Sequence, residues 1–438
     1  MKLVPTEFDM ERSFPVPREI ARHQLLETNL LIAPKIPAWI VVADHEAEAI
    51  LRLSRGASLR EAAYSLNSWG ISNANEALST LLTKLAVNDF IEPDTTIEVE
   101  DEVTLQIHVT NACNLRCKHC YVSSGEPFSL EIGVDAWIDV IEEARNRYNT
   151  VYLSISGGEP LLVPWLPELL QHSKSLGIRT SILSNGMLWT DKRIAEIGSY
   201  VDLVNVSLDG ASDTVHDAVR GNGAFRQAIR GIRRLGEAGI EVGINICLMK
   251  SNIADIEANF HNLIQSLPFK VSVLFAKFVE EGRGLENRNE AVAPDAMARL
   301  LPKLSMQFLG TGWQPTSPTK RISCGFGKLY ALYANGDVSP CLSPRYIAGN
   351  IVAEPVGKVF DRIMLNAKRA NVEKLPLCKS CDLRYICGGK CHLPQVTTGI
   401  PIHQNDCSSK FRNDYYQRLV ERGQKENGIM LPLFSRVI

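Results

Sequence analysis

Hydrophobic residues in the first hundred positions recur with the spacing of helices. Leucines at 78, 81, 82 and 85 repeat at i, i+3, i+4 and i+7, which predicts a helix. A capping box at residues 58–61 predicts the start of the helix before it, and an apolar stretch ending at Leu53 predicts one more upstream. Residues 39–42 are predicted as a strand. Residues 1–100 are therefore expected to form a small winged-helix-like domain.

Short β-rich runs alternate with longer helical ones through the middle of the chain. The six predicted strands cover residues 104–109, 151–155, 179–183, 203–207, 241–248 and 270–278. Strands separated by helices favour a parallel sheet, so residues 101–310 are expected to form an α/β domain, a partial (β/α)6 TIM-like barrel. Residues 311–438 are rich in Gly, Pro and Cys with little periodicity, and are expected to form a separate cysteine-rich domain.

Charge and termini exclude some functions. The 47 basic and 49 acidic side chains leave a net charge of -2, so no overall field attracts nucleic acid or an anionic bilayer. The N-terminus lacks the apolar core of a signal peptide, and the most apolar stretch, residues 30–43, is interrupted by two prolines and a lysine. We therefore expect a cytoplasmic protein without a membrane span. In that compartment eleven cysteines indicate metal binding rather than disulfides.

Three of these cysteines follow the first predicted barrel strand directly. Cys113, Cys117 and Cys120 have the spacing C-x3-C-x2-C, and the residues between them are mostly polar. Three thiolates on so short a loop predict a four-iron cluster in which one iron has no protein ligand. Structural zinc is the alternative, but it takes four protein ligands and no fourth cysteine lies nearby in the sequence.

Polar motifs also follow other predicted strands, at the edge where α/β barrels carry their sites. The run 156–160, Ser-Gly-Gly-Glu-Pro, contains two glycines that permit a close backbone approach to a ligand. A plain turn is the alternative, and the position at a strand end some forty residues after the cysteines disfavours it. Further strands end in Ser-Asn-Gly at 184–186 and Ser-Leu-Asp-Gly at 207–210. An arginine segment, His-Asp-Ala-Val-Arg-Gly, occupies 216–221.

The cysteine loop and these motifs resemble the radical S-adenosylmethionine (SAM) superfamily. The resemblance implies a 4Fe-4S cluster on the three loop cysteines and bound SAM, which is cleaved reductively to a 5′-deoxyadenosyl radical. It implies that SAM is contacted by Gly157, Gly158, Glu159, Asn185, Ser207, Asp209, Arg220 and Asn245. Arg220 would pair with the carboxylate of the cofactor; a solvated arginine is the alternative. Cys247, two residues after Asn245 on its strand, is expected to be a buried filler.

Seven further cysteines have the pattern C-x11-G-x4-C, then C-x2-C-x5-C-x3-C, then C. This resembles the SPASM domain, which holds two auxiliary 4Fe-4S clusters. The resemblance implies an inner cluster on Cys324, Cys341 and Cys391 and an outer cluster on Cys378, Cys381, Cys387 and Cys407, giving three clusters in all. Two structural zincs are the alternative. Family members with a fully ligated inner cluster carry an eighth cysteine before this set, which is missing here. The inner cluster is therefore expected to keep an open iron or to take another ligand, such as His403.

Residues 1–95 resemble in pattern a peptide-recognition domain related to the chaperone of pyrroloquinoline quinone biosynthesis. Such domains bind a leader peptide at a sheet edge, here near residues 39–42. A DNA-binding winged helix is the alternative, but the would-be recognition helix near 72–85 has Lys84 as its only base. Nucleic acid is therefore not an expected partner.

The complete layout resembles radical maturases of ribosomally made peptides, which install thioether or carbon–carbon cross-links. It implies a precursor peptide and an electron donor such as flavodoxin or ferredoxin as partners. Alternatives in the same superfamily are sulfatase-type maturation and tetrapyrrole or quinone cofactor synthesis. A non-catalytic iron-sulfur or zinc regulatory scaffold is the alternative from another class. The sequence assigns no catalytic acid or base.

Overall fold

A computed structural model describes residues 9–25, 27–92, 102–293, 296–297, 300–301, 304, 320–343, 345–389, 391 and 407–425. The chain divides into two compact units. Unit 1 comprises residues 1–100, 315–325 and 367–435, and unit 2 comprises 101–314, 326–366 and 436–438. The division into three functional domains stays a prediction. His403 and the segment 311–319 lie outside the described residues.

Unit 1 begins with an antiparallel sheet of order β1-β2-β3, formed by β1 (Ala21–Leu25), β2 (Thr28–Ala33) and β3 (Ala38–Val42). Helices α1 (Asp44–Ser54), α2 (Leu59–Ser68) and α3 (Ala74–Val87) follow. The expected strand and all three helices are confirmed. The capping box is also present, since Ser58 Oγ accepts from the Glu61 amide and the Glu61 carboxylate accepts from the Ser58 amide. Strands β1 and β2 were not expected from the sequence.

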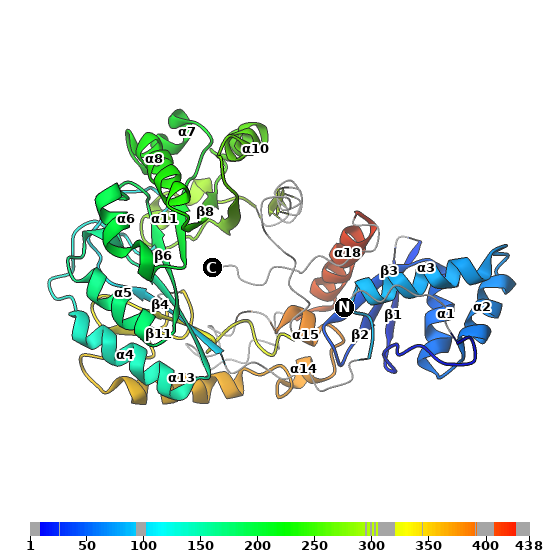
Figure 1. Cartoon of the computed structure of the whole chain (residues 1–438). Helices are drawn as coiled ribbons and strands as arrows, with labels where there is room; N and C mark the ends of the chain where they lie inside the picture. The colour runs from blue at the N-terminus through cyan, green and yellow to red at the C-terminus, as the bar shows by residue number, and fades with distance from the viewer. Residues whose placement is uncertain are drawn as a thin grey trace. The chain divides into compact units, whose positions relative to one another are not determined.

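Both faces of this sheet are covered, which explains the unbroken apolar run of β3. Ile40 and Val42 pack with the core of α1 to α3. On the opposite face Trp39 and Val41 pack with Leu419, which belongs to α18 (Ser409–Lys425). The short helices α14 (Pro376–Lys379) and α15 (Arg384–Cys387) belong to the same unit. Figure 1 shows α18 beside the strands of the small sheet. The N-terminal sheet and the C-terminal cysteine segment therefore share one hydrophobic core.

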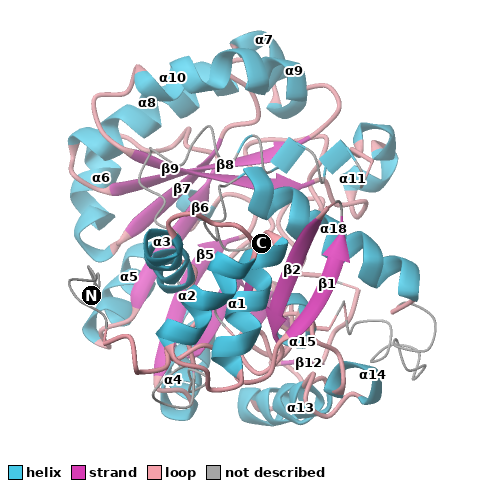
Figure 2. Ribbon diagram, turned by 90° about the vertical axis from the view of Figure 1, so that its right-hand side faces the viewer, coloured by secondary structure: helices cyan, strands magenta, loops and turns pink. Residues whose placement is uncertain are grey.

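Unit 2 contains a nine-stranded sheet of order β12-β11-β10-β4-β5-β6-β7-β8-β9. Figure 2 labels β5 to β9 of this sheet. The six expected strands are confirmed as β4 (Glu102–His108), β5 (Thr150–Ser156), β6 (Arg179–Ser184), β7 (Leu203–Ser207), β8 (Glu241–Leu248) and β9 (Val271–Lys277). They are mutually parallel, and β10 (Leu329–Leu332) pairs in parallel with β4. Strands β11 (Asp337–Ser339) and β12 (Gly349–Asn350) continue the sheet antiparallel. The mixed α/β fold with a parallel sheet is thus as expected.

The helices of unit 2 lie between these strands, except for the last helix, which follows the final strand and ends in unit 1. They are α4 (Val134–Arg147), α5 (Leu166–Ser175), α6 (Asp191–Ile197), α7 (Asp213–Arg220), α8 (Ala224–Glu237), α9 (Ile253–Asp255), α10 (His261–Gln265), α11 (Arg283–Glu286) and α13 (Val356–Arg369). Single turns are η1 (Pro160–Leu162), η2 (Gly198–Tyr200), η3 (Ile256–Phe260, a π-turn) and η4 (Arg288–Glu290). No helix among the described residues is long and apolar enough to cross a bilayer.

Alternation along the strands gives the large sheet one aliphatic and one polar face. Helix α8 packs against β7, and a Cβ at Gly186 would meet both Val206 of β7 and Ala228 of α8, so the aliphatic face meets the helices. The other face, called the inner face below, carries alternate residues in register across the strands. They are Gln106, His108, Ser154, Ser156, Asn205, Ser207, Asn245 and Cys247. The inner face and the carboxyl ends of the parallel strands are where an α/β barrel places its chemistry.

Candidate functional site

The three loop cysteines lie together just beyond the carboxyl end of β4. Cys113, Cys117 and Cys120 pack in one cluster with Leu115 and Ala224. Each sulfur faces an N–H donor: the Leu115 amide is 3.4 Å from Cys113 Sγ, the Ser124 amide 3.3 Å from Cys120 Sγ, and Arg220 Nη1 3.7 Å from Cys117 Sγ. Burial raises the pKa of Cys113 to about 11, so a nearby cation is needed to keep it a thiolate. Three clustered sulfurs with donors aimed at them fit the ligands of a metal cluster.

Two side chains that the sequence did not single out hold this loop. The Glu131 carboxylate accepts from Thr110 Oγ1 and from the Asn111 amide, both at 2.7 Å. Arg283, after β9, donates from Nε to the Cys117 carbonyl at 2.9 Å and from Nη1 to the Ser124 carbonyl at 2.8 Å. The loop conformation is therefore fixed from two sides. Neither residue belongs to a spacing motif, so no sequence signal pointed to them.

The double glycine after β5 packs directly on the cysteine loop. The Gly158 amide donates to the Thr110 carbonyl at 2.7 Å, and Gly157 has a φ of 129°. A Cβ at Gly158 would overlap the carbonyl oxygen of Ala112, so no side chain fits there. Both glycines are therefore explained structurally by their close contact with the cysteine loop. Their role in binding SAM stays a prediction.

Glu159 is fully buried and organises the end of β6. Its carboxylate accepts from Ser184 Oγ at 2.9 Å and from the Asn185 amide at 2.8 Å. Burial raises the pKa of Glu159 to about 7, although these hydrogen bonds oppose the shift. Asn185 in turn donates to Asn114 Oδ1 of the cysteine loop at 2.7 Å. Glu159 therefore acts on the loop through Asn185.

Asp209, after β7, lies at the centre of a buried charge network. Its Oδ2 is 2.6 Å from Arg220 Nε and 2.7 Å from His119 Nε2, and its Oδ1 accepts from the Cys247 amide at 2.8 Å. Burial alone would raise the pKa of Asp209, but the guanidinium of Arg220 and His119 hold it well below its ordinary range. The structure thus gives Arg220 a protein partner, and its pairing with a cofactor carboxylate stays a prediction. Half-buried Cys247 contributes its backbone to this network.

Asn245 and Ser207 sit opposite each other on neighbouring strands of the inner face. Asn245 Oδ1 is buried and has no hydrogen-bond partner within the described residues. A buried acceptor without a partner is rare in native proteins, because it loses its hydrogen bonds to water. The open oxygen therefore fits a site that a polar ligand completes.

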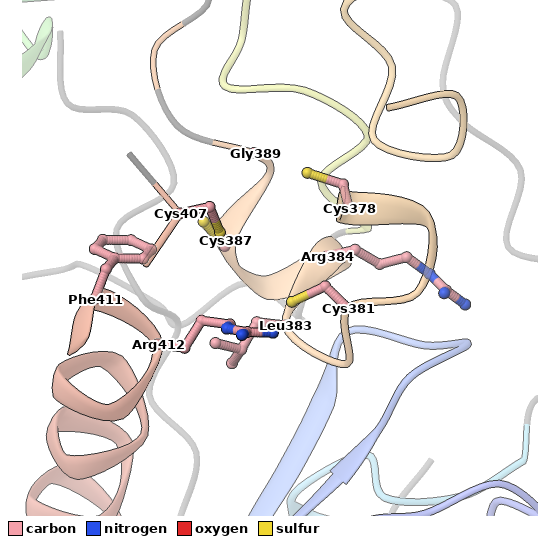
Figure 3. A pocket seen from close by; sticks show the side chains of 9 residues that line it. All are labelled: Cys378, Cys381, Leu383, Arg384, Cys387, Gly389, Cys407, Phe411 and Arg412. Atoms are coloured by element: carbon pink, nitrogen blue, oxygen red, sulfur yellow. The ribbon is translucent and has the colours of Figure 1, made fainter. Parts of the chain in front are cut away.

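The C-terminal cysteines form a second group, inside unit 1. Cys378, Cys381, Cys387 and Cys407 line one pocket together with Phe411 and Arg412 (Figure 3). Burial raises the pKa of Cys378 to about 12 and that of Cys381 to about 11. The described side chains include no set of three or more His, Cys, Asp or Glu placed for a single metal ion. The thiolates of a four-iron cluster bind different irons and so lie further apart than ligands of one ion.

The cysteines expected at the inner cluster are divided between the units. Cys324 and Cys391 are exposed residues of unit 1, and Cys341 is a half-buried residue of unit 2. Because each unit is described by itself, this ligand set stays a prediction.

Comparison with known proteins agrees with the site. Residues 107–263 match the model of the radical SAM superfamily. The mycofactocin maturase MftC of Mycobacterium tuberculosis is 26% identical over 333 residues, which is 69% of this chain and 82% of that protein. The sporulation killing factor maturation protein SkfB of Bacillus subtilis is 28% identical over 265 residues, 57% of this chain and 63% of that protein. Fe-coproporphyrin III synthase of Methanosarcina barkeri is 35% identical over 189 residues, 42% of this chain and 46% of that protein.

Among solved structures, Streptococcus suis SuiB bound to S-adenosylmethionine superimposes with a TM-score of 0.54 at 17% identity. The match covers 89% of this chain and 98% of SuiB, and at this identity it shows a shared fold. The cysteine loop, its position after β4 and the matched residues agree with one another. Residues 107–263 are therefore a radical SAM domain, of the kind that binds one 4Fe-4S cluster and SAM.

Proposed function

We propose that this enzyme is a peptide maturase. It cleaves SAM reductively, abstracts hydrogen from a ribosomally made precursor peptide and installs a thioether or carbon–carbon cross-link. The observation that carries the chemistry is the loop of Cys113, Cys117 and Cys120, in which every sulfur faces an N–H donor. When bound, a reduced 4Fe-4S cluster supplies the electron that releases the 5′-deoxyadenosyl radical from SAM. Support for a peptide substrate comes from the two maturation proteins related in sequence and from SuiB, which has been solved with the precursor peptide SuiA.

The residues around the loop would bind and orient SAM. Gly157 and Gly158 would present their backbone to its methionine part, with Glu159 and Asn185 fixing the neighbouring strand end. Ser207 and Asn245 would contact its ribose side, where the open oxygen of Asn245 requires a donor. Asp209 and Arg220 close the site with a buried ion pair.

We further propose three clusters. Cys378, Cys381, Cys387 and Cys407 would hold the outer auxiliary cluster, supported by their common pocket. Cys324, Cys341 and Cys391 would hold the inner one, with one iron open to a substrate thiolate or to another ligand. Flavodoxin or ferredoxin would supply electrons.

The N-terminal sheet would bind the leader of the peptide. Among the described strands β3 pairs with β2 alone, so its other edge offers free backbone groups to an added strand. The strand lies on a sheet whose two faces are packed, which makes the edge rigid.

The test uses the anaerobically reconstituted enzyme with SAM, a reductant and synthetic peptides translated from short reading frames beside the gene. The proposal expects a peptide with the mass loss of a cross-link, and deuterium transfer from labelled peptide into 5′-deoxyadenosine. The control is Cys117→Ala, which should do neither. Formation of iron-coproporphyrin III from a tetrapyrrole precursor, with every peptide untouched, would favour tetrapyrrole synthesis, which the related synthase suggests. Iron binding without SAM cleavage would favour a regulatory scaffold.

A further inference from the structure

A second group of buried polar side chains lies on the inner face of the sheet, beside the cysteine loop. Gln106 and His108, neighbours on this face of β4, are 2% and 4% exposed. Tyr121, which follows the last loop cysteine, places its hydroxyl 3.4 Å from Gln106 Nε2 and 3.5 Å from His108 Nε2. Tyr333, just after β10, packs its ring 4.9 Å from that of His108. None of the SAM contacts expected from the sequence includes these residues.

Two acceptor oxygens in this group are left open. Gln106 Oε1 and Glu281 Oε2 are buried, and no described residue hydrogen-bonds either of them. Glu281 lies beside this group, because its Oε1 accepts from Ser343 Oγ at 3.4 Å and the preceding residue, Leu342, accepts from the Tyr333 hydroxyl. Burying an acceptor without a partner costs free energy, so each such atom needs an explanation. If the amide of Gln106 were turned over, its nitrogen would be open instead, so one polar atom stays open in either orientation.

The neighbouring donors are already in use. Gln106 Nε2 contacts His108 and Tyr121, Tyr333 donates to the Leu342 carbonyl at 3.4 Å, and Arg345 Nε pairs with the other oxygen of Glu281 at 2.5 Å. Burial lowers the pKa of His108 to about 4, so it adds no positive charge near neutral pH. A ligand for this group must therefore bring at least one hydrogen-bond donor of its own.

The group is also fixed relative to the cysteine loop. The Arg283 amide donates to the Cys120 carbonyl at 3.0 Å, two residues after Glu281. Gly282 between them has a φ of 54°, and a Cβ there would lie 2.7 Å from the same carbonyl oxygen. A substrate group bound by Gln106 and Glu281 would thus be held at a set position from the loop.

We propose that Gln106 and Glu281 form a substrate subsite that binds an amide of the peptide, from its backbone or from an Asn or Gln side chain. An amide offers the N–H that Glu281 Oε2 requires and suits Gln106 in either orientation. The two residues position the peptide and do not take part in SAM cleavage. This inference rests on the proposed function, because it names what the same site holds.

The test compares Gln106→Met with the wild-type holoenzyme, using the peptide that the wild type modifies. Gln106→Met keeps length and removes the open polar atom. We expect KM for the peptide to rise about tenfold, the order of one lost hydrogen bond to a substrate, and more 5′-deoxyadenosine to form per modified peptide. SAM cleavage without peptide should stay at the wild-type rate. Glu281→Gln should raise KM in the same direction. Thr104→Val, on the same face of β4 two residues earlier, is the matched control and should leave KM unchanged.

An unchanged KM for the peptide in Gln106→Met would overturn the subsite. So would a loss of SAM cleavage in the absence of peptide, because the substitution would then act on the cysteine loop. The urea midpoint gives a reading that needs no substrate. The subsite predicts a midpoint lowered by no more than the two contacts of Gln106 Nε2 contribute, since the open atom itself contributes nothing to folding. A fall as large as that of a core truncation would show a structural role and overturn the subsite. A wild type that modifies no peptide contradicts the proposed function instead, and the midpoint still decides the role of Gln106.

Discussion

Replacing Asp209 with asparagine removes the negative charge from the most buried Arg–Asp ion pair among the described residues. Asp209 is 0% exposed and the Arg220 side chain 9% exposed, and Arg220 Nε lies 2.6 Å from the carboxylate. The variant leaves the guanidinium buried beside the Cys117 sulfur without its carboxylate partner. Removing one member of a buried ion pair costs about 3–5 kcal/mol, because the remaining charge loses its compensation. The folded-to-unfolded ratio should therefore fall by about two to four orders of magnitude.

The assay is anaerobic urea unfolding of the reconstituted protein, with amide hydrogen exchange as a local reading. The Cys247 amide donates to Asp209 Oδ1, so its protection should fall with the stability of the network. Asp191→Asn is the matched control. It breaks an ion pair with Arg234 at 3.4 Å whose carboxylate is 86% exposed, and should change stability by less than about 0.5 kcal/mol. If Asp209→Asn lies within about 1 kcal/mol of the wild type, the network does not stabilise the loop as argued.

Three further predictions test separate parts of the account. Gly158→Ala should lose the iron-sulfur cluster of the cysteine loop, because the added Cβ overlaps the carbonyl oxygen of Ala112. Gly133→Ala is the control and should keep the cluster, because no atom lies within 4 Å of the added Cβ. The assay is iron per chain, and equal iron in the two variants would contradict the close packing of Gly158 on the loop. Glu159 has its pKa raised from 4.5 to about 7, so its contribution to stability is present in full below pH 4.5 and lost as pH rises through about 7. The assay is the urea midpoint measured from pH 4.5 to 8, in which Glu159→Gln should remove this loss of stability. A pH dependence of the midpoint equal to that of the wild type would argue against the buried carboxyl. Cys378→Ala should lose about four irons and peptide modification while SAM cleavage persists. Cys247→Ala is the control and should keep its full iron content. Unchanged iron in Cys378→Ala would refute the outer cluster.

The sequence predicted the elements whose side chains alternate or repeat regularly. All six barrel strands were expected because each is a β-rich run between helical ones, and α2 because its capping box is local. Strand β1 was missed because it exposes Arg22 and Gln24, and its burial comes from α18, almost four hundred residues later. The covering of both faces of the N-terminal sheet is a tertiary fact that no local pattern contains.

The site was predictable where its residues lie close together in the sequence. The cysteine loop and the glycine motif are of that kind. The pairing of Asp209 with His119 joins residues ninety positions apart, and Arg283 reaches the loop from more than 160 positions away. Neither of these long-range contacts has a sequence spacing that predicts it. The parallel order of the strands alone brings the loops that carry these residues to one edge of the sheet.

The central claim is that Cys113, Cys117 and Cys120 hold a cluster that cleaves SAM. The most direct measurement is 5′-deoxyadenosine formed by the anaerobically reconstituted, reduced enzyme, quantified beside Cys117→Ala. The account predicts steady formation by the wild type and none by the variant. A wild type with full iron that forms no 5′-deoxyadenosine, or a variant that forms it at the wild-type rate, would contradict the claim.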